Sequence, residues 1–395
     1  MAENTYTDSS GLQHINALDG LRGIAIIMVV IAHLFPLQML FGYSKIAAVF
    51  LSMGSTGVDL FFVLSGFLIT GILIKNKTSV HYFRAFYARR ILRIFPLYYG
   101  LLFVFLVIVP VFSLFPDEHQ FWLSNGHWFY YWLFLNNFYS ELGVAGHMFL
   151  AVCWSLAIEE QYYLAWPLVV RHLRITNLMR IALACFLGSI ALRWFLYWRE
   201  GYAIDHLYHL TYTHLDGIAL GSFLALLYAQ HTKSAQNILA LAVRTFPYLA
   251  IIVFGVWGLI GIESDDLEKA FYSRINLLYG WALSTLWYGS ALVVALKNEG
   301  WLPRLLNIAI LRRWGQYSYA IYLLHLPVTK IFSKLLFGLG VKTGVDVAFF
   351  AASSLWAAIA YFVLLMAVAY LAGKASWLLF ECHINALKRH FSFNE

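Results

Sequence analysis

Charged residues are rare in this sequence. They make up 12% of its 395 residues, whereas 61% are hydrophobic. Soluble globular proteins carry about 25% charged residues, so this shortage excludes an ordinary soluble domain and predicts a protein that lies in the membrane.

Cysteines, N-terminal basic residues and linkers are also scarce. The three cysteines (Cys153, Cys185 and Cys382) show no metal or redox spacing, so we expect no metal site from them. The first 20 residues contain no Lys or Arg, which argues against a signal peptide. No stretch is rich in Pro, Gly or Ser and no repeat is visible, so one compact membrane domain is expected.

Long apolar runs are abundant instead. A spanning helix needs about 20 apolar residues. Ten such stretches occur, at 20–41, 56–75, 92–113, 150–170, 178–199, 211–230, 246–262, 275–296, 316–338 and 346–373. The sequence therefore predicts an all-α polytopic membrane protein with about ten transmembrane helices. A shorter aromatic segment near 127–139 is expected to be re-entrant or interfacial. The predicted units are a polar tail (1–16), a transmembrane domain (17–374) and a C-terminal tail (375–395).

Basic residues indicate the orientation of the chain. Lys and Arg concentrate in alternate connections, at 75–93, 171–180, 233–244, 297–313 and 374–389. The connections of the other set carry acidic residues, namely Asp117, Glu118, Glu141, Glu263, Asp265, Asp266 and Glu268. Since basic loops stay in the cytoplasm, both termini are predicted to be cytoplasmic. These loops also explain the net charge of +7, so no nucleic-acid partner is expected.

An arginine and a histidine stand out in the first apolar run. His33 follows Arg22 by eleven residues, which places both on one helix face and ~16 Å apart. When residues are counted from the predicted cytoplasmic end of each span, Glu159, Arg193, Asp216 and His325 lie at a similar depth in four other spans. Ionisable residues at such depth face the bundle interior, so a shared central cavity is predicted. Alternatively, these residues have only a structural role. Arg193 would then form an ion pair with Asp216, and the buried histidines would bond to backbone carbonyls.

A basic segment lies between the second and third predicted spans. Arg90 and Arg93 share a helix face, as do Arg89 and Arg93. Such a cluster could bind the phosphates of a coenzyme A thioester. It could equally hold anionic lipid headgroups.

Ordered motifs cover nearly the whole chain. They are Leu18-Asp19-Gly20-Leu21-Arg22-Gly23 with ten residues separating Arg22 from His33, the run Gly57–Ile69, Arg90-Ile91-Leu92-Arg93-Ile94-Phe95-Pro96 and Trp154–Tyr163, with weaker matches at Leu215-Asp216-Gly217 and Ser318–Pro327. With these motifs the chain resembles acyltransferase family 3, a family of integral-membrane O-acyltransferases. One departure is His214, because relatives often have an arginine before the Leu-Asp pair.

The resemblance implies a ten-span enzyme of the bacterial inner membrane. It would move an acyl group, expected to be acetyl, from cytoplasmic acyl-CoA to a hydroxyl of a glycan or glycolipid. It implies that Arg22 and His33 are needed for activity and that Arg90 and Arg93 serve the donor. No tightly bound cofactor is implied. Any second, soluble transfer step is expected to need a separate protein.

O-acyl transfer suggests a role for each candidate residue. His33 is the expected general base, with an acyl-histidine intermediate left open. Glu159 is expected to orient a histidine or accept its proton. Arg22, Arg89, Arg90 and Arg93 would bind phosphates or close the inner mouth. Lesser candidates for contacts with the oxyanion or the acceptor are Ser65, Ser155, Tyr322, His325 and Asp59, of which Asp59 could instead stabilise the start of the second span.

Two other functions fit part of the pattern. A proton-coupled secondary transporter would also need midplane His, Glu and Asp, although the missing repeat speaks against it. A metal site from His206, His209 and His214 lacks a well-placed acidic partner.

Overall fold

The computed structural model describes residues 15–35, 37–111, 128–139, 149–297, 299–343 and 354–393. Throughout these ranges the chain forms helices and turns and no strand. Most of the predicted N-terminal tail lies outside them, as do Asp117, Glu118, Glu141 and the start of the last predicted span. The predicted interfacial segment contains two short helices, α8 (Phe129–Trp132) and η3 (Asn136–Phe138).

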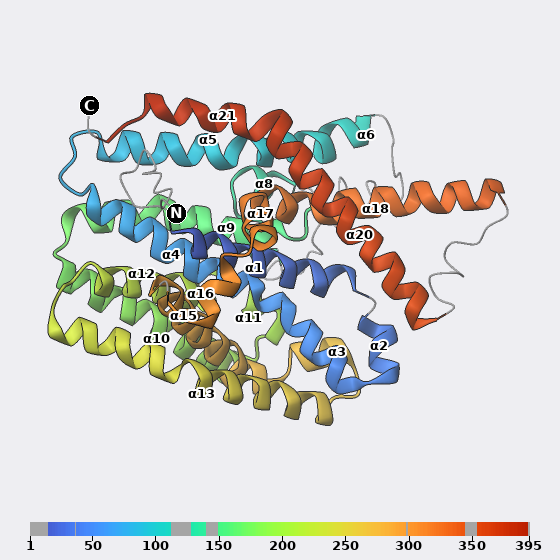
Figure 1. Cartoon of the computed structure of the whole chain (residues 1–395), viewed down its shortest axis with the longest axis horizontal. Helices are drawn as coiled ribbons and strands as arrows, with labels where there is room; N and C mark the ends of the chain where they lie inside the picture. Colours follow the sequence, from blue (N-terminus) through green and yellow to red (C-terminus); the bar gives the residue numbers. More distant parts are fainter. Residues whose placement is uncertain are drawn as a thin grey trace.

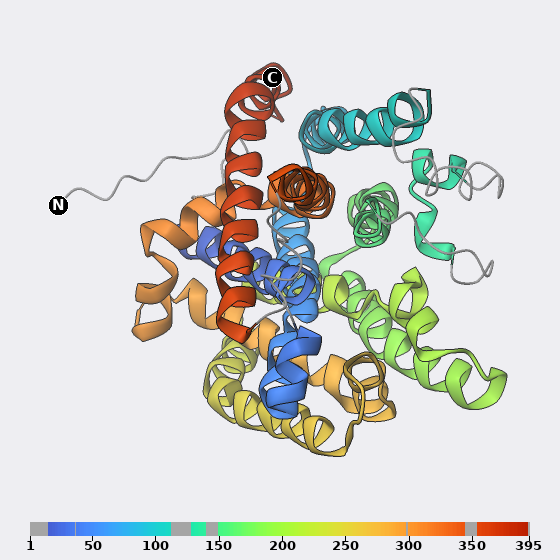
Figure 2. The same cartoon turned by 90° about the vertical axis from the view of Figure 1, so that its right-hand side faces the viewer.

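Two helices, α1 (Asn16–Leu34) and α4 (Gly57–Lys75), occupy the centre of the bundle. Figure 2 shows these blue helices surrounded by the others. The surrounding longer helices are α5 (Tyr82–Phe103), α9 (Cys153–His172), α10 (Ile175–Glu200), α12 (Asp216–Tyr228), α13 (Lys233–Glu263), α15 (Trp281–Leu296), α18 (Ser318–Thr343) and α20 (Leu355–Ser376) (Figure 1). Short helices, such as α3 (Lys45–Ser52), α16 (Trp301–Leu306) and α17 (Ala309–Gln316), complete the packing.

Seven of the described helical segments are long and apolar enough to cross a membrane. They begin at Asn16, Lys45, Tyr82, Ile175, Lys233, Asn276 and Leu355. Each of the ten predicted ranges overlaps a helix, but α12 is shorter than a span, and α9 and α18 are not among the seven. The count of ten stays a prediction.

The first predicted span ends earlier than expected. Helix α1 stops at Leu34, and a separate helix, α2, covers Leu37–Tyr43. Phe35 is extended, with φ −70° and ψ 143°. A residue that precedes a proline is disfavoured in helical conformation, and Phe35 is followed by Pro36, so the break follows from the sequence.

Glycine contacts set the closest helix pairs. A Cβ on Gly66 would collide with the backbone of Ile218, and one on Gly221 with that of Val63, so α4 and α12 pack backbone to backbone. Small residues permit this close approach in membrane helices. A Cβ on Gly20 would likewise strike Leu306. A Cβ on Gly23 would strike Leu311, so the beginning of α1 packs closely against both α16 and α17.

One end of the bundle gathers the basic connections. Helices α4, α9 and α12 end there, and α5, α10 and α13 begin there, at the left in Figure 1. We call it the basic end, because it carries Lys75, Lys77, Arg171, Arg174 and Lys233. Which side of the membrane this end faces stays a prediction.

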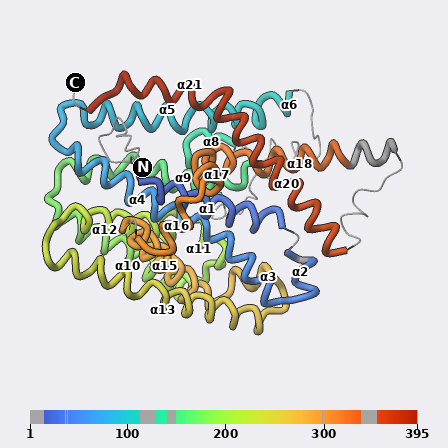
Figure 3. The backbone as a smooth tube through the Cα atoms, in the orientation of Figure 1, coloured from blue at the N-terminus to red at the C-terminus, as the bar shows by residue number. Residues whose placement is uncertain are grey.

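The predicted tail at 375–395 does not separate from the bundle. Helix α20 continues through a π-helical turn, η7 (Trp377–Glu381), into α21 (Cys382–Ala386) and η8 (Leu387–His390). This final stretch packs along α5 at the basic end. Figure 3 shows the red C-terminal helix crossing the molecule to reach it.

Candidate active site

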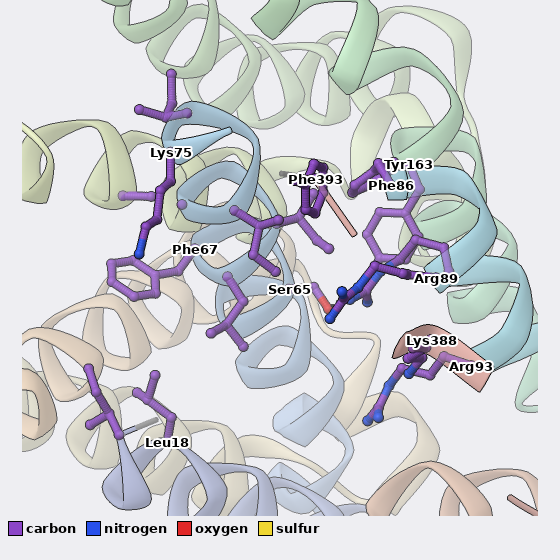
Figure 4. A pocket seen from close by; sticks show the side chains of 18 of the residues that line it. Leu18, Ser65, Phe67, Lys75, Phe86, Arg89, Arg93, Tyr163, Lys388 and Phe393 are labelled. Atoms are coloured by element: carbon purple, nitrogen blue, oxygen red, sulfur yellow. Dashed lines mark hydrogen bonds between the residues drawn. The ribbon is translucent and has the colours of Figure 1, made fainter. Parts of the chain in front are cut away.

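The basic end opens into a large cavity. Its volume is about 940 Å³, and it lies among α1, α4, α5, the end of α12 and the C-terminal stretch. Its lining includes Arg22, Ser65, Arg89, Arg90 and Arg93. Figure 4 shows Arg89, Arg93 and Lys388 on the opposite side from Lys75, with Ser65 between them. The predicted cluster of arginines therefore lines a space large enough for a nucleotide-sized ligand.

A smaller chamber of about 110 Å³ adjoins this cavity. The two spaces share five lining residues: Arg22, Ser65, Arg90, Arg93 and Tyr163. Arg22 and Arg90 lie within electrostatic range of Arg93, so three like charges from two helices meet here. Asp19, which lies 3.4 Å from Arg22 Nη1, offsets part of this charge, and a bound anion would further reduce the repulsion among the arginines. The lining is thus suited to an anionic ligand.

Glu159 lies in this chamber and bonds to two hydroxyl groups. Ser65 Oγ donates to Glu159 Oε1 at 2.6 Å, and the hydroxyl of Tyr163 lies 3.0 Å from both Glu159 Oε2 and Ser65 Oγ. The Arg90 guanidinium is 5.9 Å from the Tyr163 ring. Glu159 and Tyr163 are four residues apart in α9 and so share one helix face.

The position of Glu159 corrects the predicted layer of ionisable residues. Glu159 shares the chamber with Arg22, whereas His33 is ~16 Å further along α1. The prediction counted the depth of His33 from Arg22 but that of Glu159 from Arg171, so the two counts had different starting points. Glu159 thus bonds to the hydroxyls of Ser65 and Tyr163 and lies within electrostatic range of Arg22 and Arg90.

Ser155 and Tyr322 line the same chamber, one helical turn from Glu159 and from His325 respectively. Their hydroxyls bond to each other, and both are near the Val152 carbonyl, at 3.2 Å and 3.0 Å. Both hydroxyl hydrogens are therefore used within this group. Ser65 likewise directs its hydrogen to Glu159, so these hydroxyls would have to rearrange to donate to an oxyanion.

His33 and His325 form a pair one turn of α18 beyond the chamber. His33 Nδ1 is 3.3 Å from His325 Nε2, and the ring centroids are 5.1 Å apart. His325 Nδ1 is 2.8 Å from the Tyr322 carbonyl and 3.2 Å from that of Ile321. His325 is fully buried, whereas His33 is exposed, so His33 is the member that a substrate could reach.

These contacts constrain the tautomers of the neutral pair. Carbonyl oxygens only accept hydrogen bonds, so His325 Nδ1 carries its proton and Nε2 is an acceptor. A ring N–H of His33 has two acceptors within reach, His325 Nε2 and the Val29 carbonyl. When His33 Nδ1 carries the proton and donates to His325 Nε2, the lone pair of His33 is on Nε2, which can take a proton from a hydroxyl.

Lys330 is a further cation near the histidine pair. It lies within electrostatic range of both His33 and His325, and its ammonium is 5.7 Å from the Phe149 ring centroid. Lys330 was not predicted from the sequence. Its position five residues after His325 in α18 could have indicated a cation near that histidine.

Asp59 belongs to a separate group, which we call the buried quartet: Asp59, Arg193, His214 and Asp216. Arg193 Nη2 donates to Asp216 Oδ2 at 2.9 Å, and His214 Nε2 is 2.6 Å from Asp59 Oδ1. All four side chains are at most 1% exposed, and none lines either cavity. The structural alternative for Arg193 and Asp216 is therefore confirmed as an ion pair. His214 pairs with Asp59, and the described residues contain no metal site formed by His206, His209 and His214.

Comparison with known proteins identifies the family. A family model described as an acyltransferase domain matches residues 15–374. The chain belongs to this acyltransferase family. It is 29% identical over 349 residues to a peptidoglycan O-acetyltransferase of Listeria monocytogenes, covering 82% of this chain and 51% of the relative. It is 30% identical over 340 residues to a putative peptidoglycan O-acetyltransferase of Bacillus subtilis, covering 82% and 50%.

A putative O-acetyltransferase of Staphylococcus aureus is 28% identical over 343 residues, covering 82% of this chain and 52% of the relative. The chain spans about half the length of these curated relatives. No solved structure matches it significantly. The predicted resemblance is confirmed, and the seven apolar helices agree with a multi-pass membrane acyltransferase.

In this acyltransferase, the predicted site residues fall into three groups. The cavity and chamber hold Arg22, Arg89, Arg90, Arg93, Ser65, Glu159, Ser155 and Tyr322; the histidine pair holds His33 and His325; the buried quartet holds Asp59. Tyr163, which bonds to Glu159, was not among the predicted site residues, although its i, i+4 spacing from Glu159 could have indicated it.

Proposed function

We propose that the protein transfers an acetyl group from acetyl-CoA to a hydroxyl of a cell-wall glycan, with the basic end in the cytoplasm of a bacterium and the helices in its inner membrane. The continuity of the basic cavity with the chamber is the observation that carries this proposal. The volume suits a nucleotide, and three arginines attract its phosphates. The acceptor class follows from the relatives named as peptidoglycan O-acetyltransferases.

The donor would lie with its nucleotide in the large cavity and its acyl arm through the chamber. Arg22, Arg90 and Arg93 would hold the pyrophosphate, because guanidinium groups bind phosphate oxygens by charge-assisted bonds. The arm would then pass Tyr322 toward His325, which is one helical turn away.

Catalysis would take place at the histidine pair. His33 Nε2 takes the proton of the acceptor hydroxyl as its oxygen attacks the thioester carbonyl. The Lys330 ammonium stabilises the negative charge that develops on the carbonyl oxygen. The carbon–sulfur bond then breaks, and the proton on His33 passes to the leaving thiolate. The products are the acetyl ester and coenzyme A.

The test uses the purified protein in lipid vesicles. Acetyl-CoA labelled in the acetyl group is added together with peptidoglycan fragments, and the fragments are analysed by mass spectrometry. The expected result is a base-labile acetyl mass on the glycan that depends on both the protein and acetyl-CoA. Binding of acetyl-CoA without any transfer to a hydroxyl would contradict the proposal. The transporter alternative predicts flux of a solute across the vesicle wall instead, and the family match gives it no support.

A further inference from the structure

The last described residues of the chain form part of the large cavity. Asn385, Ala386, Lys388, Arg389 and Phe393 all line it. We call residues 382–393 the C-terminal wall. The sequence predicted a C-terminal tail at 375–395. The place of these residues in the cavity wall depends on contacts with the bundle.

Such contacts attach the C-terminal wall to α5 and to the turn before it. The Arg89 guanidinium donates to the Phe391 carbonyl at 3.4 Å, and Ser79 Oγ donates to the carbonyl of Phe393. The Arg84 guanidinium lies 5.9 Å from the Phe391 ring. Phe393 itself is only 5% exposed. The wall is therefore a packed element that holds its basic residues at a defined position.

The cavity thus has two groups of cations. The inner group is Arg22, Arg90 and Arg93, which also line the chamber. The outer group lines the large cavity alone: Arg89 on α5, and Lys388 and Arg389 on the C-terminal wall. Lys75 of α4 also lines only the large cavity, but on the opposite side (Figure 4). A ligand with phosphates at one position would need only one of these two groups of cations.

A coenzyme A thioester carries two separate anionic groups, a pyrophosphate and a phosphate on its ribose. We propose that the C-terminal wall is a binding element for the ribose phosphate, with Lys388 and Arg389 as its contacts, while the inner arginines hold the pyrophosphate. This inference rests on the proposed acyl-CoA donor. Lys388 and Arg389 would then distinguish coenzyme A from donors that lack the ribose phosphate.

The test compares coenzyme A with dephospho-coenzyme A, which lacks only the ribose phosphate. Binding is measured by calorimetry on the full-length protein in nanodiscs of zwitterionic lipid. The wild-type protein is expected to bind coenzyme A about 10- to 100-fold more tightly, since the phosphate forms charge-assisted bonds. The double variant Lys388→Ala/Arg389→Ala should bind both ligands with the affinity that the wild type has for dephospho-coenzyme A.

A matched control removes the same charge elsewhere. Lys374 and Arg304 are exposed and line neither cavity, so Lys374→Ala/Arg304→Ala should keep the preference for coenzyme A. The conservative variant Lys388→Arg/Arg389→Lys should keep it as well. Size-exclusion profiles of all variants report whether the protein is folded.

The outcomes separate this inference from the proposed function. If the wild type binds neither ligand, the acyl-CoA donor itself is wrong. If the wild type prefers coenzyme A and the double alanine variant keeps that preference, only the role of the wall is wrong. Anionic lipid headgroups share the phosphate chemistry, so a second set of nanodiscs contains phosphatidylglycerol. A double variant that loses bound phosphatidylglycerol while it retains the preference would identify a lipid site and overturn the inference.

Discussion

The chamber around Glu159 and the buried quartet both collect ionisable side chains from several helices, but their charge balance and their surroundings differ. The chamber brings Arg22, Arg90 and Arg93 near Glu159 and opens into the large cavity. The quartet sets two aspartates against Arg193 and His214 and lines neither cavity. The arginines border open space where a ligand can enter, and Asp19, Glu159, Glu160 and Glu381 offset part of their charge. The quartet is paired and sealed, and such a group serves the fold.

The quartet nevertheless retains unused hydrogen-bonding capacity. Within the described part of the chain, Asp59 Oδ2, His214 Nδ1 and Arg193 Nε and Nη1 have no hydrogen-bond partner. The Arg193 guanidinium lies 5.5 Å from the Trp281 ring, which offsets part of this cost. Charged residues at the centre of a membrane protein therefore do not by themselves identify a catalytic site. Contact with a cavity is the additional criterion.

The largest effect is expected at the histidine pair. His33→Ala should lower turnover by about 10²- to 10⁴-fold, because it removes the general base. Binding of acetyl-CoA should remain, since Arg22 lies ~16 Å away along α1, and Arg90 and Arg93 are on another helix, α5. Turnover and donor affinity are measured on the same purified sample, and unchanged turnover would remove His33 from the mechanism.

The same preparation distinguishes the two histidine mechanisms. Without an acceptor, a general base leaves no acyl group on the protein. An acyl-histidine intermediate would accumulate labelled protein that hydroxylamine releases. We expect no such label on the wild type.

The second prediction concerns the buried quartet. Arg193→Ala should destabilise the protein by about 3–5 kcal/mol, because it leaves the Asp216 carboxylate buried without its cation. Denaturant unfolding in detergent measures this change. The paired replacement Arg193→Met/Asp216→Leu should cost less, since no unpaired charge remains. A single variant with full stability but poor donor binding would assign the quartet to the site instead.

The third prediction concerns the inner arginines. Arg90→Ala/Arg93→Ala should raise the KM for acetyl-CoA by about 10- to 100-fold, because two charge-assisted contacts with phosphate are lost. Stability should change little compared with the Arg193 variant. Arg174→Ala/Arg180→Ala removes the same charge from exposed positions and should leave KM unchanged. Equal effects of the two double variants would show that only the overall charge of the basic end matters.

The sequence predicted those parts of the site that depend on local spacing. Arg90 and Arg93 share a helix face, and each predicted helix contains the residues assigned to it. The common depth predicted for His33 and His325 agrees with the contact between their rings, although the sequence did not predict that these two would pair. The common depth failed for Glu159 because its count began at Arg171 and that of His33 began at Arg22. The sequence does not show how these two starting points lie relative to each other.

Long-range packing accounts for the other differences. The role of the C-terminal wall depends on contacts between Arg89 and Phe391, which are 302 residues apart, and no local pattern encodes such a contact. The same holds for His214 and Asp59, which are 155 residues apart. The departure of His214 from the usual arginine was visible in the sequence, but its partner was not.

The smallest effect is expected from the two hydroxyl groups that donate hydrogen bonds to Glu159 in the chamber. Ser65→Ala removes the bond to Glu159 Oε1, and Tyr163→Phe removes the one near Oε2. A hydrogen bond to a charged group contributes about 1.5–3 kcal/mol, so each change should lower kcat/KM by roughly 10-fold or somewhat more. Glu159 then turns toward the arginines and competes with the phosphates, so the loss should appear in KM. A loss confined to kcat would instead place Glu159 at the reacting atoms. The double variant measures the coupling, because both hydroxyls contact one carboxylate and each other, and their effects should not add.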